Sequence, residues 1–200
     1  MHPNPQEKEV IDTMRKDIIL AGVGGQGILT IATIIAQSAL KAGFNVRQPE
    51  IHGMSQRGGA VEAHLRLSSE PIFSDLIAHG TADLIIALEP MEALRHLDSL
   101  AADGVVIANK KPITNIADYP PVEDIIAEIN AIPGSKVIDA DGIAASLGNA
   151  RSMNIVLLGA ATPFLGIDSQ ILKETIVGLF QRKGQDVVDA NIKAFEAVAK

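Results

Sequence analysis

The chain has 200 residues, enough for one large domain with a substantial core, and its hydrophobic fraction of 47% is that of an ordinary globular protein. A net charge of −7 and an aromatic content of 3%, with no tryptophan, disfavour a nucleic-acid partner. The absence of cysteine excludes disulfides, thiolate zinc sites and cysteine-ligated iron–sulfur clusters within this chain.

Residues 1–16 are polar and of mixed charge, which predicts an N-terminal extension and not a signal peptide. The longest apolar-rich segment, Ile28 to Leu40, is interrupted by polar residues and is too short to cross a bilayer. We therefore expect a cytoplasmic protein in which residues 17–200 form a single domain.

The first predicted unit has the pattern of a Rossmann-like βαβ unit. "DIILAGVGGQG" predicts a buried parallel strand that ends in a tight glycine turn. The next segment, from Gly27 to Gly43, has the length and apolarity of a helix, and Gly43 is typical of a helix end. Residues 44–51 are expected to return as a second strand, with Pro49 at a strand end or a sheet edge.

The segment that follows departs from simple alternation of strands and helices. The stretch "GAVEAHLRLSSEPIFS" alternates like a half-buried strand from Val61 to Leu67, and residues 71–77, after the Ser-Ser-Glu-Pro turn, are the expected partner in an inserted β-hairpin. Two further buried strands, "ADLIIALEP" and "DGVVIANKKP", bracket a helical segment. A short helix and a strand at 136–140 come next.

From Ile143 onward the chain is expected to be helical, in three pieces separated at Pro163, Gly166 and Gly184. In the last piece, valines, alanines and a phenylalanine recur at helical spacing on one face. The whole pattern predicts an α/β fold: a doubly wound, mostly parallel sheet with an inserted hairpin and a helical C-terminal third.

The turn "GVGGQG" matches the spacing G-x-G-x-x-G at Gly22, Gly24 and Gly27, between a predicted strand and a predicted helix. Glycines allow the backbone to approach a pyrophosphate, and a helix N-terminus offers free N–H groups to an anion. Glu50 lies about where a ribose-binding acid would fall. The same glycines are equally consistent with a close strand–helix crossing and no ligand, and the amide of Gln26 suits either role.

A second polar loop, "HGMSQRGG", follows the second predicted strand and weakens the dinucleotide interpretation, because a crossover helix would be expected there. Ligands in such sheets bind at the carboxyl ends of the strands, so this loop should lie near the glycine turn. Arg57 beside the amides of Gly58 and Gly59 would suit a phosphate or a carboxylate. The alternative is a glycine-relaxed turn with Arg57 in solvent.

Two Glu-x-His pairs, Glu50 with His52 and Glu62 with His64, would each present a carboxylate and an imidazole on one face of a strand. Such pairs can form a metal site or an acid–base pair, but a solvated face is the favoured interpretation. "DADG" at 139–142 is interpreted as a strand end that caps the next helix, and not as part of a thiamine-diphosphate motif.

Four ordered blocks resemble a known family. "ILAGVGGQGILT", "PEIHGMSQRGGAVEAHLR", "ADLIIALEPMEALR" and "RSMNIVLLGA" are similar to the gamma-type subunits of 2-oxoacid:ferredoxin oxidoreductases. The resemblance runs from about Asp17 to Lys200. The block "HGMSQRGG" is similar to the arylpyruvate type, the small (beta) subunit of indolepyruvate ferredoxin oxidoreductase; pyruvate and oxoglutarate types usually carry a Gly-Pro-Glu version.

The resemblance implies a subunit that is inactive alone and completes a larger enzyme. That enzyme decarboxylates a 2-oxoacid, reduces ferredoxin and forms an acyl-coenzyme A. Thiamine diphosphate, Mg and 4Fe-4S clusters are then expected on the alpha subunit, ferredoxin is the electron acceptor, and coenzyme A is a co-substrate. This chain would bind no metal, no membrane and no nucleic acid, and could form a homodimer when isolated.

By this resemblance two loops face the substrate or the coenzyme, and Arg57 is expected to contact the oxoacid carboxylate or a coenzyme phosphate. No catalytic residue, and no role for His52 or His64, follows from the sequence. The expected site residues are Gly22, Gly24, Gly25, Gln26, Gly27, Met54, Ser55, Gln56, Arg57, Gly58 and Gly59.

Two other functions remain open from the sequence. One is a free-standing NAD- or FAD-binding oxidoreductase built on the glycine turn. The other is a phosphate-binding scaffold module without catalysis.

Overall fold

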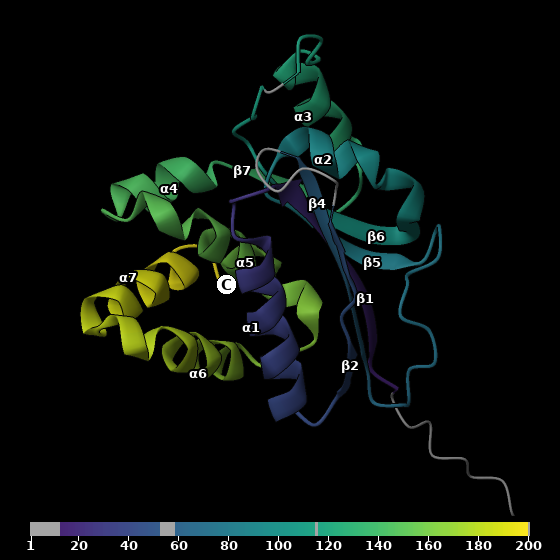
Figure 1. Cartoon of the computed structure of the whole chain (residues 1–200). Helices are drawn as coiled ribbons and strands as arrows, with labels where there is room; N and C mark the ends of the chain where they lie inside the picture. The colour runs from purple at the N-terminus through teal and green to yellow at the C-terminus, as the bar shows by residue number, and fades with distance from the viewer. Residues whose placement is uncertain (1–12, 53–58, 115, 200) are drawn as a thin grey trace, which may run out of the picture.

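The computed structural model describes residues 13–52, 59–114 and 116–199. Its centre is a seven-stranded sheet, with helices on both faces (Figure 1). The strands are β1 (Arg15–Val23), β2 (Asn45–Arg47), β3 (Glu50–His52), β4 (Ala60–Ser68), β5 (Ala82–Ala87), β6 (Leu100–Asn109) and β7 (Lys136–Ile138). The helices are α1 (Ile28–Lys41), α2 (Pro90–Arg95), α3 (Val122–Ala131), α4 (Ala140–Ser146), α5 (Met153–Leu165), α6 (Ser169–Phe180) and α7 (Gln185–Glu196).

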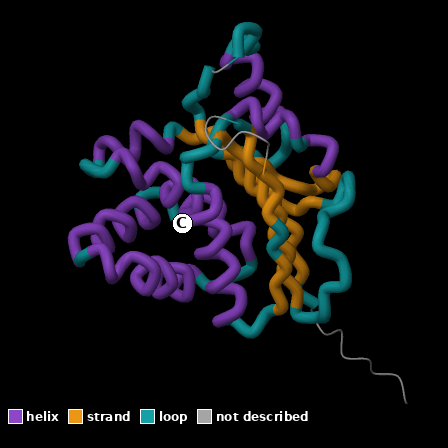
Figure 2. The backbone as a smooth tube through the Cα atoms, in the orientation of Figure 1, coloured by secondary structure: helices purple, strands orange, loops and turns teal. Residues whose placement is uncertain are grey.

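The strand order β2-β4-β1-β5-β6-β7 confirms a doubly wound, mostly parallel sheet. β1, β5, β6 and β7 are parallel neighbours, while β4 runs antiparallel to β1 and to β2. The helices α1 and α4–α7 lie on one side of the sheet, and α2 and α3 on the other (Figures 1 and 2). Within the described ranges, no helix combines the length and apolarity needed to span a membrane.

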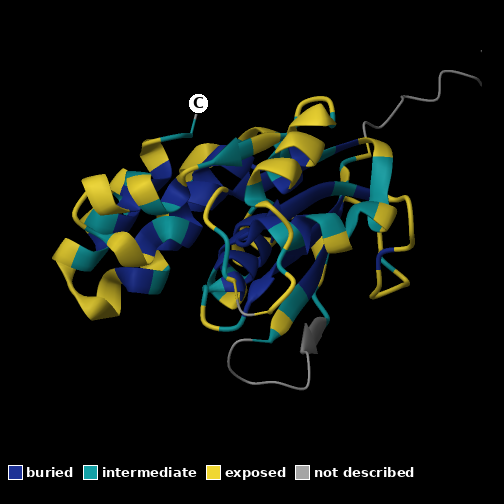
Figure 3. Ribbon diagram, turned by 90° about the horizontal axis from the view of Figure 1, so that it is seen from above, coloured by how far each residue is buried: buried dark blue, intermediate teal, exposed yellow. Residues whose placement is uncertain are grey.

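β1 is buried on both faces, which explains its continuous apolar run. Ile18 and Leu20 pack into the core beneath α1 and α5, and Ile19 packs into the smaller core beneath α2 and α3. All three side chains are fully buried. Figure 3 shows this pattern for the whole molecule, with buried strands inside and exposed residues on the outer helices.

The second predicted strand needs correction. Residues 44–51 form two short strands, β2 and β3, separated by Pro49, which lies at the sheet edge as expected. Neither strand lies beside β1, because β4 is inserted between β1 and β2. The βαβ unit therefore exists as β1-α1-β2, but its two strands are separated by one antiparallel strand.

The expected hairpin partner of β4 is also wrong. Residues 71–77 form no strand, and β4 pairs instead with β1 over nine residue pairs and with β2 and β3. Pro71 lacks an N–H and so cannot continue the ladder. The carbonyls of Ser74 and Leu76 accept hydrogen bonds from the Arg66 side chain, at 3.0 and 3.1 Å, and not from a partner strand.

The C-terminal third is helical, but it contains four helices and not three pieces. Gly166 and Gly184 mark helix boundaries as predicted, with φ angles of 67° and 103°. Pro163, in contrast, lies inside α5. Pro163 cannot donate to the Gly159 carbonyl, but α5 continues through it to Leu165, and the break expected there does not occur.

Candidate functional site

The glycine turn joins β1 to α1 at the carboxyl edge of the sheet. Gly25 and Gly27 have φ angles of 99° and 89°, a conformation that side chains other than glycine rarely adopt. Gly27 also lies against Asn154 of α5, whose Nδ2 donates to the Gly27 carbonyl at 3.3 Å. The glycine at 27 is therefore required both by its backbone conformation and by a close side chain.

Gln26 braces this turn. Its Oε1 accepts from the Val23 amide at 2.7 Å, and its Nε2 donates to the Leu88 carbonyl at the end of β5, at 2.9 Å. A Cβ at Gly22 would lie only 2.7 Å from the same Oε1, which accounts for glycine at that position. Both ends of the Gln26 amide are thus engaged within the protein, while the residue itself also lines the cleft described below.

The structure brings the glycine turn next to one end of the second polar loop. The Gly24 amide donates to the Gly59 carbonyl at 2.9 Å. For Gly59, this contact confirms the prediction that the second polar loop lies near the glycine turn. It also means that the Gly24 amide is not available to an anion. Met54, Ser55, Gln56, Arg57 and Gly58 lie outside the described residues.

A cleft of about 540 Å³ opens at the N-terminus of α1. α1 has neither a side-chain cap nor an acidic residue in its first turn, so the positive end of its dipole has no anionic partner from the helix itself. Two cationic side chains, Arg151 and Lys183, also line the cleft, together with the acidic side chain of Asp186. The lining residues are Gly25, Gln26, Gly27, Thr30, Gly148, Asn149, Arg151, Asn154, Phe180, Lys183, Asp186, Val187, Ala190 and Asn191.

Only part of the lining of this cleft was predicted from the sequence. Gly25 and Gly27 were expected site residues, and Arg151 opens the fourth block of the resemblance, "RSMNIVLLGA". Lys183 and Asp186 carried no sequence signal. They approach the glycine turn only because α7 packs on α5, and α5 carries Asn154, which contacts Gly27.

A polar network lies beside the cleft, at the ends of β1 and β5. After β1 the chain continues into α1 on one face of the sheet, and after β5 it continues into α2 on the other face. The Leu88 carbonyl accepts from Gln26 and, at 3.3 Å, from the buried amide of Asn109. Asn109 also donates to Asp141 at 2.8 Å. Asp139 caps α4 through the Gly142 amide at 2.9 Å, which confirms the capping interpretation of "DADG".

On the other face of the sheet, the carboxylate of Glu89 caps α2 and is 1% exposed. It accepts from the amides of Glu92 and Ile113 at 3.0 and 3.2 Å, and from the hydroxyl of Tyr119. Burial and the hydrogen bond to Glu89 raise the pKa of Tyr119, so its hydroxyl remains a donor at neutral pH. The contacts of Glu89 are structural: one caps α2, and the other two tie the start of α2 to the loop before α3.

The Glu62–His64 pair does not lie on a solvated face, so the interpretation that the sequence favoured is wrong. His64 is 8% exposed, and its Nε2 lies 3.6 Å from Glu62 Oε1. The other Glu62 oxygen lies 3.3 Å from Nε2 of His96, at the end of α2. Burial lowers the pKa of both histidines, so both imidazoles are neutral at pH 7. Among the described residues no group of histidines and carboxylates could hold a metal ion.

The position of β4 also bears on the dinucleotide alternative. In that alternative the second strand lies beside β1 and its end holds the adenosine half. Here β4 occupies the place next to β1, and β3 pairs with β4 beyond it. The geometry therefore disfavours NAD or FAD binding at the glycine turn.

Comparisons with known proteins agree with this architecture. The model of the family described as pyruvate ferredoxin/flavodoxin oxidoreductase matches residues 17–200. The chain is 38% identical to the indolepyruvate oxidoreductase subunit IorB of Pyrococcus horikoshii, over 92% of this chain and 94% of that protein. The IorB protein of Archaeoglobus fulgidus is also 38% identical, over 92% and 93%. The 2-oxoglutarate synthase subunit KorC of Methanothermobacter marburgensis is 28% identical, over 92% and 95%.

A solved relative shows the same fold inside a longer chain. The 2-oxoglutarate:ferredoxin oxidoreductase of Magnetococcus marinus, with 2-oxoglutarate, coenzyme A and succinyl-CoA bound, superposes with a TM-score of 0.74 at 25% identity. The match covers 92% of this chain and 30% of that one. This chain belongs to the pyruvate ferredoxin/flavodoxin oxidoreductase family, and it is a subunit of a 2-oxoacid:ferredoxin oxidoreductase that resembles the indolepyruvate type.

Proposed function

We propose that this chain is the subunit without thiamine and iron–sulfur clusters of an arylpyruvate:ferredoxin oxidoreductase, with indolepyruvate as the first candidate substrate. One observation carries the choice: identity to IorB proteins is 38%, against 28% to the oxoglutarate-type subunit, over similar shares of the chain. In this reaction the oxoacid carboxylate leaves as CO₂, two electrons pass to ferredoxin, and the acyl group joins the coenzyme A sulfur as its thiol loses a proton.

The partner carries the reactive groups in this proposal. A chain without cysteine cannot ligate a 4Fe-4S cluster through thiolates, and its one Asp-x-Asp-Gly segment is used to cap α4. Thiamine diphosphate, Mg and the clusters are therefore assigned to the alpha subunit, where thiamine supplies carbanion stabilisation.

The substrate class can be tested by co-purifying this chain with its thiamine-binding partner and assaying a panel of 2-oxoacids with ferredoxin. Indolepyruvate and phenylpyruvate should give kcat/KM at least about tenfold above pyruvate and 2-oxoglutarate, a difference of about 1.4 kcal/mol in transition-state binding. Equal or higher kcat/KM for pyruvate would contradict the proposal.

We extend the proposal to the cleft at the N-terminus of α1 as the place where the phosphates of coenzyme A bind. The uncapped N-terminus of α1 and the cationic side chains of Arg151 and Lys183 favour a phosphate in this cleft. Asp186 is available to a ribose hydroxyl. The apolar Val187 and Ala190 offer surface to the rest of the molecule.

Replacing Arg151 or Lys183 with glutamine should raise the KM for coenzyme A about three- to tenfold, since each exposed charge–phosphate contact contributes about 1 kcal/mol. The KM for the oxoacid and kcat should not change. Because exposed charges are screened by salt, the effect should shrink at 0.5 M NaCl. Lys193→Gln, on the exposed side of α7, is the matched control and should behave as wild type. An unchanged coenzyme A KM in both cleft variants would refute this site.

Arg57 remains the predicted anion contact of the second loop. Arg57→Ala in the same complex should depress turnover and leave subunit assembly intact. A raised KM for the oxoacid would indicate a carboxylate contact, and a raised KM for coenzyme A a phosphate contact. Unchanged kinetics for both would remove Arg57 from the site.

A further inference from the structure

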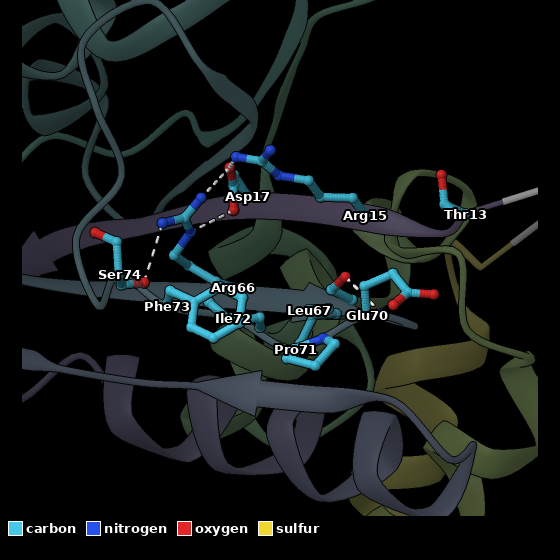
Figure 4. A pocket seen from close by; sticks show the side chains of 11 residues that line it. Thr13, Arg15, Asp17, Arg66, Leu67, Glu70, Pro71, Ile72, Phe73 and Ser74 are labelled. Atoms are coloured by element: carbon cyan, nitrogen blue, oxygen red, sulfur yellow. Dashed lines mark hydrogen bonds and ion pairs between the residues drawn. The ribbon is translucent and has the colours of Figure 1, made fainter.

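The loop of residues 69–81, here called loop 69–81, crosses from β4 to β5 without forming a strand or a helix. It displays the most exposed of the large apolar side chains that the structure describes, Phe73, which is 96% exposed. The loop is nevertheless anchored to β4 at two positions. Arg66 donates to the carbonyl of Ser74 (Figure 4) and to that of Leu76, and the Ile77 amide donates to Nδ1 of His64 at 3.1 Å.

The second anchor determines the tautomer of His64. Because Nδ1 accepts a hydrogen bond from a backbone amide, the proton of the neutral ring is on Nε2, and that nitrogen is the one directed at Glu62. A protonated His64 would carry hydrogens on both nitrogens. The Nδ1 hydrogen would then point at the hydrogen of the Ile77 amide, and the bond between them could not persist.

We propose that His64 is a pH-sensitive clasp, which holds loop 69–81 against β4 when neutral and releases its Ile77 end when protonated. The Arg66 anchor does not involve the His64 ring, because its guanidinium donates directly to the two carbonyls. Acid should therefore free the segment around Ile77 and leave Ser74 and Leu76 attached.

The charged groups around His64 set the direction of the effect. Glu62 on the same strand and Asp17 on β1 favour the protonated ring, whereas Arg66 on β4 opposes it. His96 and, beyond it, Arg95 face the cluster from the end of α2. Burial dominates and lowers the pKa of His64 below 6.5. The clasp is thus closed at neutral pH and opens only as the pH falls below 6.5.

The test is amide hydrogen exchange of the whole chain between pH 5 and 7.5, corrected for the intrinsic rate at each pH. Protection of the Ile77 amide should fall by about tenfold for each pH unit below the pKa of His64. His64→Asn should abolish this dependence and retain protection, because its Oδ1 takes the place of Nδ1 and cannot be protonated. His64→Gln, whose amide reaches the Nε2 position, should leave Ile77 unprotected at every pH.

His79→Asn, an exposed histidine of the same loop, is the matched control and should behave as wild type. His96→Asn should also keep the pH dependence. Equal Ile77 protection at pH 5 and 7.5 in wild type, or unchanged pH dependence in His64→Asn, would overturn the proposal. If the variants fail to fold, nitrogen-15 NMR of wild-type His64 decides: the Nε2–H tautomer at pH 7.5 supports the clasp, and the Nδ1–H tautomer refutes it.

Discussion

Replacing Asp17 with asparagine should lower the free energy of unfolding by about 3–5 kcal/mol, the range for breaking a buried, hydrogen-bonded ion pair. Asp17 is 2% exposed, and its two carboxylate oxygens accept from Nε and Nη2 of Arg66 at 2.8 and 3.0 Å (Figure 4). The Arg66 side chain is itself only 11% exposed. An asparagine would turn an amide donor toward a guanidinium, and so leave a buried cation without its anion.

The measurement is urea-induced unfolding followed by circular dichroism. Arg15→Gln is the matched control, because Arg15 contacts the same carboxylate at 2.8 Å but is 61% exposed. Its loss should cost less than about 1 kcal/mol. A double variant, Asp17→Leu with Arg66→Met, should regain much of the lost stability, since apolar replacement of a whole buried pair is often neutral. Equal losses in Asp17→Asn and Arg15→Gln would contradict the argument.

Replacing Gly27 with alanine should destabilise the protein by about 2–3 kcal/mol. The positive φ of 89° costs an alanine about 1–2 kcal/mol, and the new Cβ would also collide with Nδ2 of Asn154. Asn154 must then move, and the hydrogen bond to the Gly27 carbonyl is lost. Because Gly27 also lines the cleft, the KM for coenzyme A should rise in the reconstituted enzyme.

Gly25→Ala separates the two causes. Gly25 has a φ of 99°, but a Cβ there would meet nothing within 4 Å, so only the conformational cost of about 1–2 kcal/mol should appear. Thermal unfolding of the two variants gives the comparison. Adding Asn154→Ala to Gly27→Ala should cost less than Asn154→Ala does in the wild type. Equal losses in the two glycine variants would show that Asn154 does not determine the residue at 27.

Much of the core follows from periodicity. The continuous run of β1 predicts a strand buried on both faces, and helix and strand positions follow from apolar spacing and from glycine boundaries such as Gly43 and Gly166. These signals are local, because the residues that carry them lie within one helix or strand, and the burial or backbone conformation that they indicate concerns that same element. Pro163 was not a helix end, because the buried helix α5 continues through it despite the one hydrogen bond that a proline cannot donate.

The order of the strands in the sheet and the residues that line the cleft could not be predicted from such local signals. The pattern of β4 states which residues face the core, but not whether residues 71–77, β1 or β2 supply its partner. From the sequence, Glu62 and His64 were predicted to lie on a solvent-exposed face of a strand. Nothing in the sequence indicates that His96 and Ile77 pack against them. Lys183 reaches the cleft only through the packing of α7 on α5.

The amino-acid sequence by itself determined the α/β class, the glycine turn and the family, because each depends on residue types at fixed spacing along the chain. Only the tertiary structure decided that β4 lies between β1 and β2, that Gln26 is hydrogen-bonded to the end of β5, and that two cations line the same cleft as the glycine turn. Those features depend on contacts between segments far apart in sequence. Such contacts arise when each element buries its apolar face on a particular neighbour, and that choice is made by the folded chain as a whole.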